Sequence, residues 1–326
     1  MTWQRFTGSA DKWDALVEGL GATTPFQLSA WAAFRESFGW QPTRLITKDG
    51  TSAAQLLVKR VGPVRVAWGA GAPLGVVTPS LLHDLLDETK RLLDAKVLYL
   101  RLADHAPLAS ERRTAFRMAG WSAATPIGSV TTLRRSLATP TETLSASFSS
   151  NWARNLRRGE QRQVSAELWL NPDTQIIATL HREVEDVKQP FHAEWRGDDA
   201  AIKRLIDCFG ERIVVVKAHD VTGAVLALRA AVIVGANAYD FLAATSRDGR
   251  KTYASNVALA ALLDLLAKRG LQNYDFGGVD RVKNKGVFDF KHGAGGTEVA
   301  YVGEYEATYP RFAKRVLAKL VTSRTR

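Results

Sequence analysis

The stretch that decides the fold of this chain reads Tyr274-Asp275-Phe276-Gly277-Gly278-Val279, then Phe290-Lys291-His292-Gly293-Ala294-Gly295-Gly296, then Tyr301-Val302-Gly303-Glu304-Tyr305. Its features are a strand, a glycine turn, a basic segment that ends in Phe-Lys, a second glycine cluster and another strand. Glycine adopts backbone conformations closed to other residues and lets a ligand approach the main chain closely. Because the two glycine clusters frame Lys291, this lysine is the first candidate for a catalytic residue.

The length and composition predict a globular protein of two domains. The chain has 326 residues, and a domain usually takes roughly 100 to 200 residues. Hydrophobic residues make up 46% and charged residues 24%, which is typical of a globular protein rather than a disordered or disulfide-stabilised one. The net charge of +11 favours a polyanionic partner, with a solubility effect as the alternative.

Cysteine and histidine usage argues against a disulfide or a metal site. Cys208 is the only cysteine, and its apolar neighbours indicate a buried thiol. No two of the six histidines stand at metal-ligand spacing, so no metal is expected. The N-terminus has no apolar signal segment and no stretch is long and apolar enough to span a membrane. We therefore expect a cytoplasmic protein.

The first half of the chain alternates short helices and strands. Asp49-Gly50 is a strong hairpin signal between two apolar runs. The predicted elements are a helix at 29–39, strands at 43–48 and 53–60, a helix at 81–93, a strand at 96–102, a helix at 110–119 and a strand at 129–135.

The second half repeats this order without obvious sequence identity. The predicted elements are a strand at 164–170, helices at about 172–188 and 199–210, strands at 212–219, 224–234 and 238–244, a helix at 255–269 and a strand at 273–276. Each half is thus an α+β arrangement of the GNAT acyltransferase type, and the chain is expected to hold two such domains in tandem.

A proline-marked polar segment at residues 139–143 separates the halves. The predicted domains are therefore residues 1–140 on the acceptor-substrate side, residues 141–306 with the aminoacyl donor and Lys291, and a basic C-terminal helix at 307–326. That helix could meet phosphates through one face and pack through the other.

Two further segments carry chemistry. Arg154, Arg157 and Arg158 fall within one and a half helical turns next to Trp152, and clustered guanidinium groups bind phosphate, although such a cluster is more often a solvated face. Near the N-terminus, residues 25–31 read Pro-Phe-Gln-Leu-Ser-Ala-Trp, with Arg35 one turn after Trp31.

Together these segments resemble the FemABX family of aminoacyl-tRNA-dependent peptidyltransferases, from about residue 23 to 305. The resemblance is strong at the C-terminal end and moderate at 26–40 and 150–158. Two departures stand out: residues 68–73, Trp-Gly-Ala-Gly-Ala-Pro, replace a Pro-Arg-Gly-Pro type turn, and the long helical arm of some members is absent. This indicates a compact, FemX-like member, expected to be a monomer, whose acceptor stays open.

The resemblance implies amide formation between an amino acid esterified to tRNA and a primary amine on a peptidoglycan precursor or a peptide antibiotic intermediate. The acceptor is then a small peptide, linked to a nucleotide or a lipid, with peripheral membrane contact as an option. No cofactor is implied beyond aminoacyl-tRNA as co-substrate. Physically, the enzyme must align two polyanionic substrates and stabilise the developing oxyanion.

The same resemblance assigns roles to individual residues. Lys291 is the catalytic cation; Arg154, Arg157, Arg158 and Lys285 bind tRNA phosphates; and Trp31, Arg35, Tyr239, Phe241, Asp275 and Phe290 bind substrate. Arg35 is the expected contact to the diphosphate of a nucleotide-linked precursor.

Plainer interpretations stand beside three of these roles. Lys291 could instead pair with Asp289 or Glu298. Tyr239 and Phe241 could be core residues of a strand. Asp275 could accept a proton from the amine, although a side chain that satisfies the amides of the glycine turn is the preferred interpretation.

Two other function classes remain open. One is an N-acyltransferase that uses acyl-CoA, although residues 247–255 lack the glycine spacing that usually cradles a pyrophosphate. The other is a non-enzymatic RNA-binding protein, which would explain the charge but not the glycine-framed Lys291.

Overall fold

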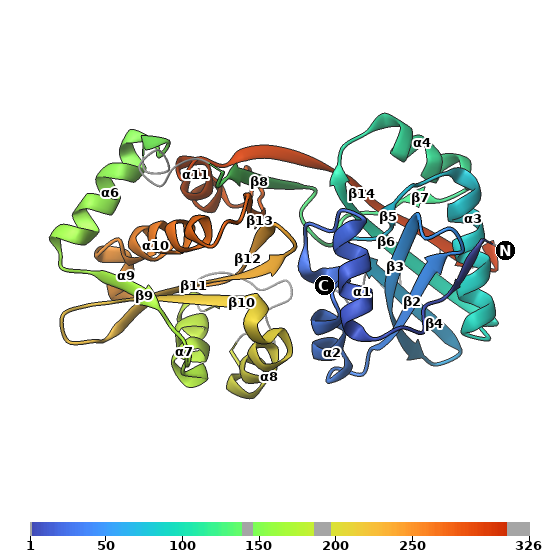
Figure 1. Ribbon diagram of the computed structural model, residues 1–326, viewed down its shortest axis with the longest axis horizontal. Helices are drawn as coiled ribbons and strands as arrows, with labels where there is room; N and C mark the ends of the chain where they lie inside the picture. The colour runs from blue at the N-terminus through green and yellow to red at the C-terminus, as the bar shows by residue number, and fades with distance from the viewer. Residues whose placement is uncertain (1, 139–145, 186–196, 312–326) are drawn as a thin grey trace. The chain divides into compact units, whose positions relative to one another are not determined.

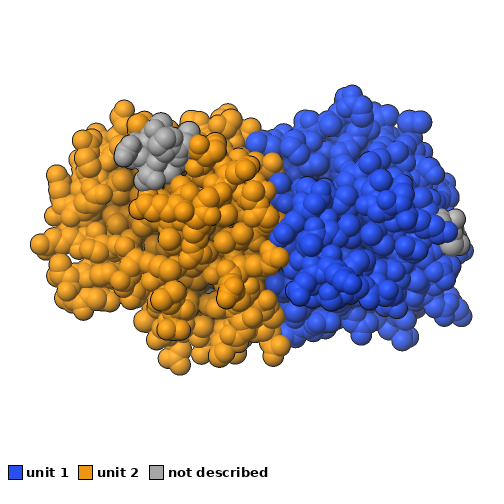
Figure 2. Space-filling view, viewed as in Figure 1, with its two compact units in different colours: residues 1–130, 299–326 blue, residues 131–298 orange. Residues whose placement is uncertain are grey.

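The computed structural model describes residues 2–138, 146–185 and 197–311. The chain divides into two compact units, unit 1 with residues 1–130 and 299–326 and unit 2 with residues 131–298 (Figures 1 and 2). Each unit combines a mixed β-sheet with helices, which is the predicted α+β class.

Unit 1 has the strand order β1-β2-β3-β4-β6-β14, in which β4 and β6 run parallel and the other neighbours antiparallel. Its strands are β1 (Trp3–Arg5), β2 (Gln41–Thr47), β3 (Ser52–Val61), β4 (Val64–Ala70), β5 (Leu74–Gly75), β6 (Val97–Pro107), β7 (Ser122–Ala123) and β14 (Thr297–Tyr309). Its helices are α1 (Ala10–Gly19), η1 (Pro25–Gln27), α2 (Ser29–Glu36), α3 (Pro79–Leu92) and α4 (Ser110–Met118).

The predicted hairpin at Asp49-Gly50 is confirmed as the β2–β3 connection. The Asp49 carboxylate accepts hydrogen bonds from the Thr47 hydroxyl at 2.7 Å and the Thr51 amide at 3.1 Å. Gly50 has a φ of 74°, a left-handed conformation that glycine adopts without the strain of a Cβ atom. The local turn chemistry therefore sets the register of the first two long strands.

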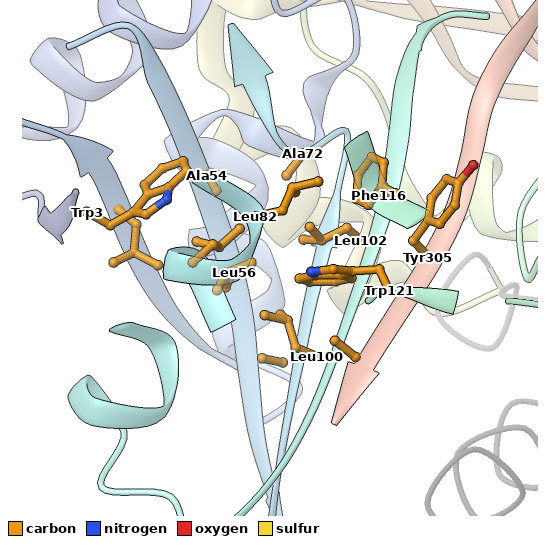
Figure 3. Packing of buried hydrophobic residues seen from close by; sticks show 14 of the residues in the cluster. Trp3, Ala54, Leu56, Ala72, Leu82, Leu100, Leu102, Phe116, Trp121 and Tyr305 are labelled. Atoms are coloured by element: carbon orange, nitrogen blue, oxygen red, sulfur yellow. The ribbon is translucent and has the colours of Figure 1, made fainter. Parts of the chain in front are cut away.

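The core of unit 1 lies between its sheet and helices α3 and α4 (Figure 3). Leu56 and Leu82 in this core are at most 1% exposed. The ring of Phe116 on α4 stacks on Tyr305 of β14 at 4.1 Å between centroids. Burial of such large apolar side chains is the main source of stability, and here it fastens the C-terminal strand to the N-terminal unit.

Unit 2 has the strand order β8-β13-β12-β11-β10-β9, in which β12 and β13 run parallel and the other neighbours antiparallel. Its strands are β8 (Thr131–Ser136), β9 (Ser165–Leu168), β10 (Ile213–His219), β11 (Val225–Val234), β12 (Asn237–Thr245) and β13 (Asn273–Gly278). Its helices are α6 (Ser150–Gln161), α7 (Thr174–Glu185), α8 (Asp199–Phe209), η2 (Gly210–Arg212), α9 (Arg247–Lys251), α10 (Ala254–Lys268) and α11 (Lys285–Gly293).

Both sheets follow one plan, which is an antiparallel run of four strands, one parallel pair and a final antiparallel strand. The final strand of each sheet lies on the other side of the domain boundary from the one predicted, because the domains were expected to divide at residue 140 and to end at residue 306. β8 was expected in the first domain but pairs with β13, and β14 was expected in the second but pairs with β6, Tyr305 opposite Leu102. Local patterning indicates a strand without naming its partner, which long-range packing decides.

The predicted C-terminal helix at 307–326 is wrong at its first residues. Residues 307–309 belong to β14 rather than to a helix, and residues 312–326 lie outside the described part of the chain. In that described part, no helix combines the length and the apolar character that a membrane crossing needs.

Candidate functional site

The parallel strands β12 and β13 are paired over three residues each, ending with Tyr239 opposite Asp275, and they separate beyond this point. β12 continues to Thr245 beside β11, whereas β13 ends at Gly278 beside β8. A β-bulge in β12 makes Phe241 the extra residue opposite β11. Bulges bend a strand and are frequent next to active sites. We call this place, formed by residues 239–241 and 275–278, the β12–β13 fork.

Lys291 lies in the last turn of α11 and reaches the end of β13. Its Nζ donates to the carbonyl oxygens of Phe276 at 2.5 Å and Gly278 at 3.3 Å. The alternative partners are engaged elsewhere, because Asp289 pairs with Lys285 at 2.5 Å and Glu298 pairs with Arg281. The ammonium group is therefore placed at the fork.

The glycines on both sides of α11 serve two purposes. Gly277 has a φ of 71°, and a Cβ atom there would lie 3.4 Å from the Tyr239 hydroxyl and from the Asp240 carbonyl oxygen. At Gly296 a Cβ atom would lie 2.9 Å from that of Leu133, which is too close. Gly277 thus keeps the main chain bare beside Tyr239, whereas Gly296 permits close packing within the protein.

An arginine of β8 fixes the end of α11. Arg135 donates to the carbonyl oxygen of Ala294 at 2.5 Å and to the Ser147 hydroxyl at 2.6 Å. Burial lowers the pKa of Arg135 to about 10, because a low-dielectric surrounding disfavours the charged form.

The cation that covers Phe290 is one that the sequence analysis missed. The guanidinium carbon of Arg229 lies 4.9 Å from the Phe290 ring centroid, and Arg229 pairs with Asp240 at 2.7 Å with both side chains less than 10% exposed. Arg229 is the only charged residue in the otherwise apolar β11. A lone charge in a buried strand was the signal that could have found it.

Tyr274 belongs to the same buried cluster. Burial raises the pKa of Tyr274 well above its ordinary value, and the negative charge of Asp240 raises it further. Within the described residues, neither the Tyr274 hydroxyl nor Oδ1 of Asp240 has a hydrogen-bond partner. Asp240 is therefore a buried charge that depends mainly on Arg229.

Asp275 has the structural role that the sequence analysis preferred. Its carboxylate accepts hydrogen bonds from the Gly277 amide at 2.8 Å, from Nε of Arg134 at 2.8 Å and from the Thr132 hydroxyl. The residue is 3% exposed. These contacts fix the turn that ends β13.

The two aromatic residues of β12 differ in their surroundings. Tyr239 lies at the fork beside Gly277. Phe241 packs on Phe209 of α8, with 5.4 Å between ring centroids. Their predicted substrate contacts remain predictions.

The predicted arginine cluster lies on α6. Arg154, Arg157 and Arg158 are exposed, but Trp152 is 3% exposed and packs 4.1 Å from Phe148. Trp152 is thus a core anchor of α6 rather than a surface neighbour of the arginines. Lys285, the fourth predicted phosphate contact, begins α11.

In unit 1, aromatic rings surround Arg35. Its guanidinium carbon lies 5.5 Å from the Trp31 ring centroid, 5.4 Å from that of Phe38 and 5.7 Å from that of Trp40. Burial lowers the pKa of Arg35, and its Nε has no hydrogen-bond partner among the described residues. The predicted pair of Trp31 and Arg35 is therefore in contact, as one cation–π cluster.

Unit 1 also holds a cavity of about 140 Å³ at the carboxyl ends of the parallel strands β4 and β6. Asp104 in its wall pairs with Arg112 at 2.7 Å, and burial raises the pKa of Asp104 while Arg112 opposes that effect. His105 stacks on Tyr301 at 4.9 Å between ring centroids. No role was assigned to these residues from the sequence, because nothing local marks them as neighbours.

No group of three or more histidine, cysteine, aspartate or glutamate side chains in the described ranges is placed to hold a metal ion.

Comparison with solved structures decides the fold. FemX superposes with a TM-score of 0.81 at 15% identity, covering 97% of this chain and all of that one. The chain has a FemX-like fold. A tandem GNAT protein from the clavulanic acid biosynthesis pathway gives a TM-score of 0.56 at 13% identity, covering 94% of this chain and 98% of that one. The prediction of two tandem GNAT-like domains is thereby confirmed.

The fold is also similar to that of L-PGS, at a lower TM-score. The L-PGS structure from Bacillus licheniformis gives a TM-score of 0.55 at 13% identity and covers 98% of each chain. No protein-family model matches the sequence, and no curated protein matches it.

Proposed function

We propose that this protein is an aminoacyltransferase that moves an amino acid from tRNA to a primary amine of a peptidoglycan precursor or a related peptide. In the reaction the amine nitrogen bonds to the ester carbon, the bond to the ribose oxygen breaks, and a proton passes from the amine to that oxygen. The FemX-like fold over nearly the whole chain supports acyl transfer in general. We place the reaction in the cytoplasm and expect a monomer.

The observation that carries the proposal is the position of Lys291. Its ammonium group is held by two main-chain carbonyls where β12 and β13 part. A fixed positive charge at the reacting carbonyl stabilises the oxyanion that forms when the amine attacks. Because the ester is already activated, alignment and this charge supply what the reaction needs.

The other residues have supporting roles in the proposal. Tyr239 and Phe290 form part of the donor wall at the fork, whereas Asp275 and Gly277 fix its floor. Trp31 and Arg35 bind the acceptor in unit 1. The exposed arginines of α6 and Lys285 contact the tRNA.

The test is transfer of label from a radiolabelled aminoacyl-tRNA pool to candidate peptide precursors, with ribonuclease treatment of the donor as the blank. Lys291→Ala should lower the transfer rate by about 100-fold or more while the circular dichroism spectrum and tRNA affinity stay unchanged. Lys283→Ala is the matched control, since Lys283 is 88% exposed in the same segment. Transfer by Lys291→Ala within a few-fold of the wild type would remove the catalytic assignment.

The second candidate is an acyl-CoA-dependent N-acyltransferase, which the tandem GNAT fold supports. Against it, residues 247–251 form the short helix α9 and Tyr253 caps α10 without a glycine-rich loop. Acetyl-CoA in place of aminoacyl-tRNA in the same assay separates the two. Binding of tRNA without any transfer would instead indicate the RNA-binding alternative.

A further inference from the structure

A row of arginines on α6 marks a binding surface in unit 2. Arg154, Arg158 and Arg162, the last at the C-cap, follow one another at intervals of four residues and are all exposed. Residues four apart lie on one face of a helix, and each step rises about 6 Å along the axis. The adjoining face of the helix buries Trp152 and Gly159. The row therefore presents a line of evenly spaced cations.

This arrangement has a cost for the helix. Like charges four residues apart weaken a helix, and in the described chain none of the three arginines forms an ion pair with a carboxylate. Each donates a hydrogen bond to a neutral group: Arg154 to Asn151 at 2.6 Å, Arg158 to the Tyr253 hydroxyl at 3.3 Å and Arg162 to the carbonyl oxygen of Lys251. A feature that disfavours the fold locally is expected where a ligand compensates for it.

A second element extends the row. Tyr253 lies under two of the arginines, 5.9 Å from Arg158 and 5.2 Å from Arg162 between guanidinium carbon and ring centroid. Tyr253 has a φ of 58°, a strained value for a residue other than glycine, and such strain gathers at ligand sites. Arg250 and Lys251 of α9 stand close by in sequence and are exposed.

Close packing holds α6 against the end of α9 and the start of α10, because a Cβ atom at Gly159 of α6 would lie 3.3 Å from the carbonyl oxygen of Thr252, the C-cap of α9. A Cβ atom at Gly159 of α6 would lie 2.6 Å from Cγ2 of Val257 on α10, so the lack of a side chain lets the helices meet at this point. The arginines of α6 and the cations of α9 consequently form one surface, which we call the α6–α9 basic surface: Arg154, Arg158, Arg162, Arg250, Lys251 and Tyr253.

We propose that the α6–α9 basic surface binds the single-stranded 3′ end of a tRNA. Guanidinium groups bind phosphate in a forked geometry, and an aromatic ring beside a cationic track is the usual platform for a stacked base. The inference rests on the proposed function for the identity of the RNA, and it extends the RNA contact from one helix to two elements.

The experiment measures binding of a fluorescent RNA oligonucleotide ending in CCA to the full-length protein across about 50 to 200 mM salt. Arg158→Gln combined with Arg162→Gln should weaken binding about tenfold and lower the salt slope by about 1.4, or 0.7 for each lost phosphate contact. Tyr253→Asn, which keeps a residue tolerant of positive φ, should weaken binding about tenfold through loss of stacking.

The matched control is Arg204→Gln combined with Arg269→Gln, which removes the same charge from exposed positions on α8 and at the C-cap of α10. It should leave affinity and slope within twofold of the wild type. Equal weakening by both double variants would show that net charge alone is sensed and would overturn the proposal. If the variant with Arg158→Gln and Arg162→Gln keeps its RNA affinity and loses binding to anionic lipid vesicles, that result overturns the RNA proposal and assigns the surface to a membrane.

The same variants keep this inference separate from the proposed function. If the first pair loses RNA binding but the wild type transfers no amino acid, the surface stands and the transferase proposal fails. If transfer and RNA affinity both persist in the first pair, the surface assignment fails and the transferase proposal stands.

Discussion

The Arg229–Asp240 pair beneath Phe290 permits a test in which a second substitution should restore stability. Arg229→Met keeps an apolar stem of similar length but leaves the Asp240 carboxylate, 6% exposed, without its cation at 2.7 Å. Breaking a buried pair by removal of one partner costs about 3–5 kcal/mol, and the lost contact with Phe290 is included in that range. We therefore expect unfolding of unit 2 to become easier by about 4 kcal/mol.

Adding Asp240→Asn to Arg229→Met should recover about 2 kcal/mol, because the uncompensated charge disappears and only a buried amide with incomplete hydrogen bonding remains, at a cost of about 1–3 kcal/mol. The control is Lys217→Met, which breaks the pair with Glu167 at 3.0 Å, where Glu167 is 57% exposed. A pair with a solvent-exposed carboxylate contributes little to stability, so Lys217→Met should leave the unfolding of unit 2 nearly unchanged.

The measurement is urea unfolding combined with hydrogen exchange of the β11 and β12 amides. Since a chain of two units need not unfold in one step, the exchange rates report on unit 2 by itself. A double variant less stable than Arg229→Met alone would refute the account, because it would show that the Asp240 charge is satisfied without Arg229.

Gly159→Ala should destabilise unit 2 by about 1–3 kcal/mol, since its Cβ atom would lie 2.6 Å from Val257. Gly286→Ala, whose Cβ atom would have no atom within 4 Å, should instead stabilise unit 2 by about 0.5 kcal/mol. Equal melting temperatures of the two variants would contradict this expectation. Two tyrosines should resist alkaline titration. Burial raises the pKa of Tyr99 and of Tyr274, so the folded protein keeps both phenols neutral above the pH near 10 at which an unfolded tyrosine ionises. The contribution of these two neutral phenols to stability is therefore complete below about pH 10 and falls as the pH rises further. An absorbance titration in which all 7 tyrosines ionise by about pH 11 while the protein is still folded would exclude this.

Most strands and helices could be predicted because their signals are local. Asp49-Gly50 fixes a hairpin by turn chemistry, and Leu259, Leu262 and Leu266 repeat at helical spacing on α10. The helix α11 went unassigned, because its sequence mixes glycine with phenylalanine and has no side-chain cap at its N-terminus. The strand partners of β8 and β14 could not be predicted. β8 pairs with β13 at the far end of its own unit in sequence, and β14 pairs with β6 across the whole sequence of unit 2.

The candidate site divides in the same way. Lys291 and its glycines stand out locally, whereas its contact with the Phe276 carbonyl depends on how α11 folds back on β13. Arg229 lies 61 positions before Phe290 in sequence, and only the sheet brings them together. Arg35 was placed correctly beside Trp31, but enclosure by Phe38 and Trp40 follows from the turn after α2.

The late arrival of β14 has a consequence for synthesis of the chain. β6 has β4 as its neighbour on one side and β14 on the other. Residues 131–296, nearly all of unit 2, are translated after β6 and before β14. At bacterial or eukaryotic elongation rates this takes roughly 10–30 s, during which the nascent sheet offers an unpaired edge to other chains. A chaperone or a neighbouring nascent copy of the chain can bind that edge before β14 is made. A fragment that ends at residue 130 lacks β14, so its β6 edge stays unpaired.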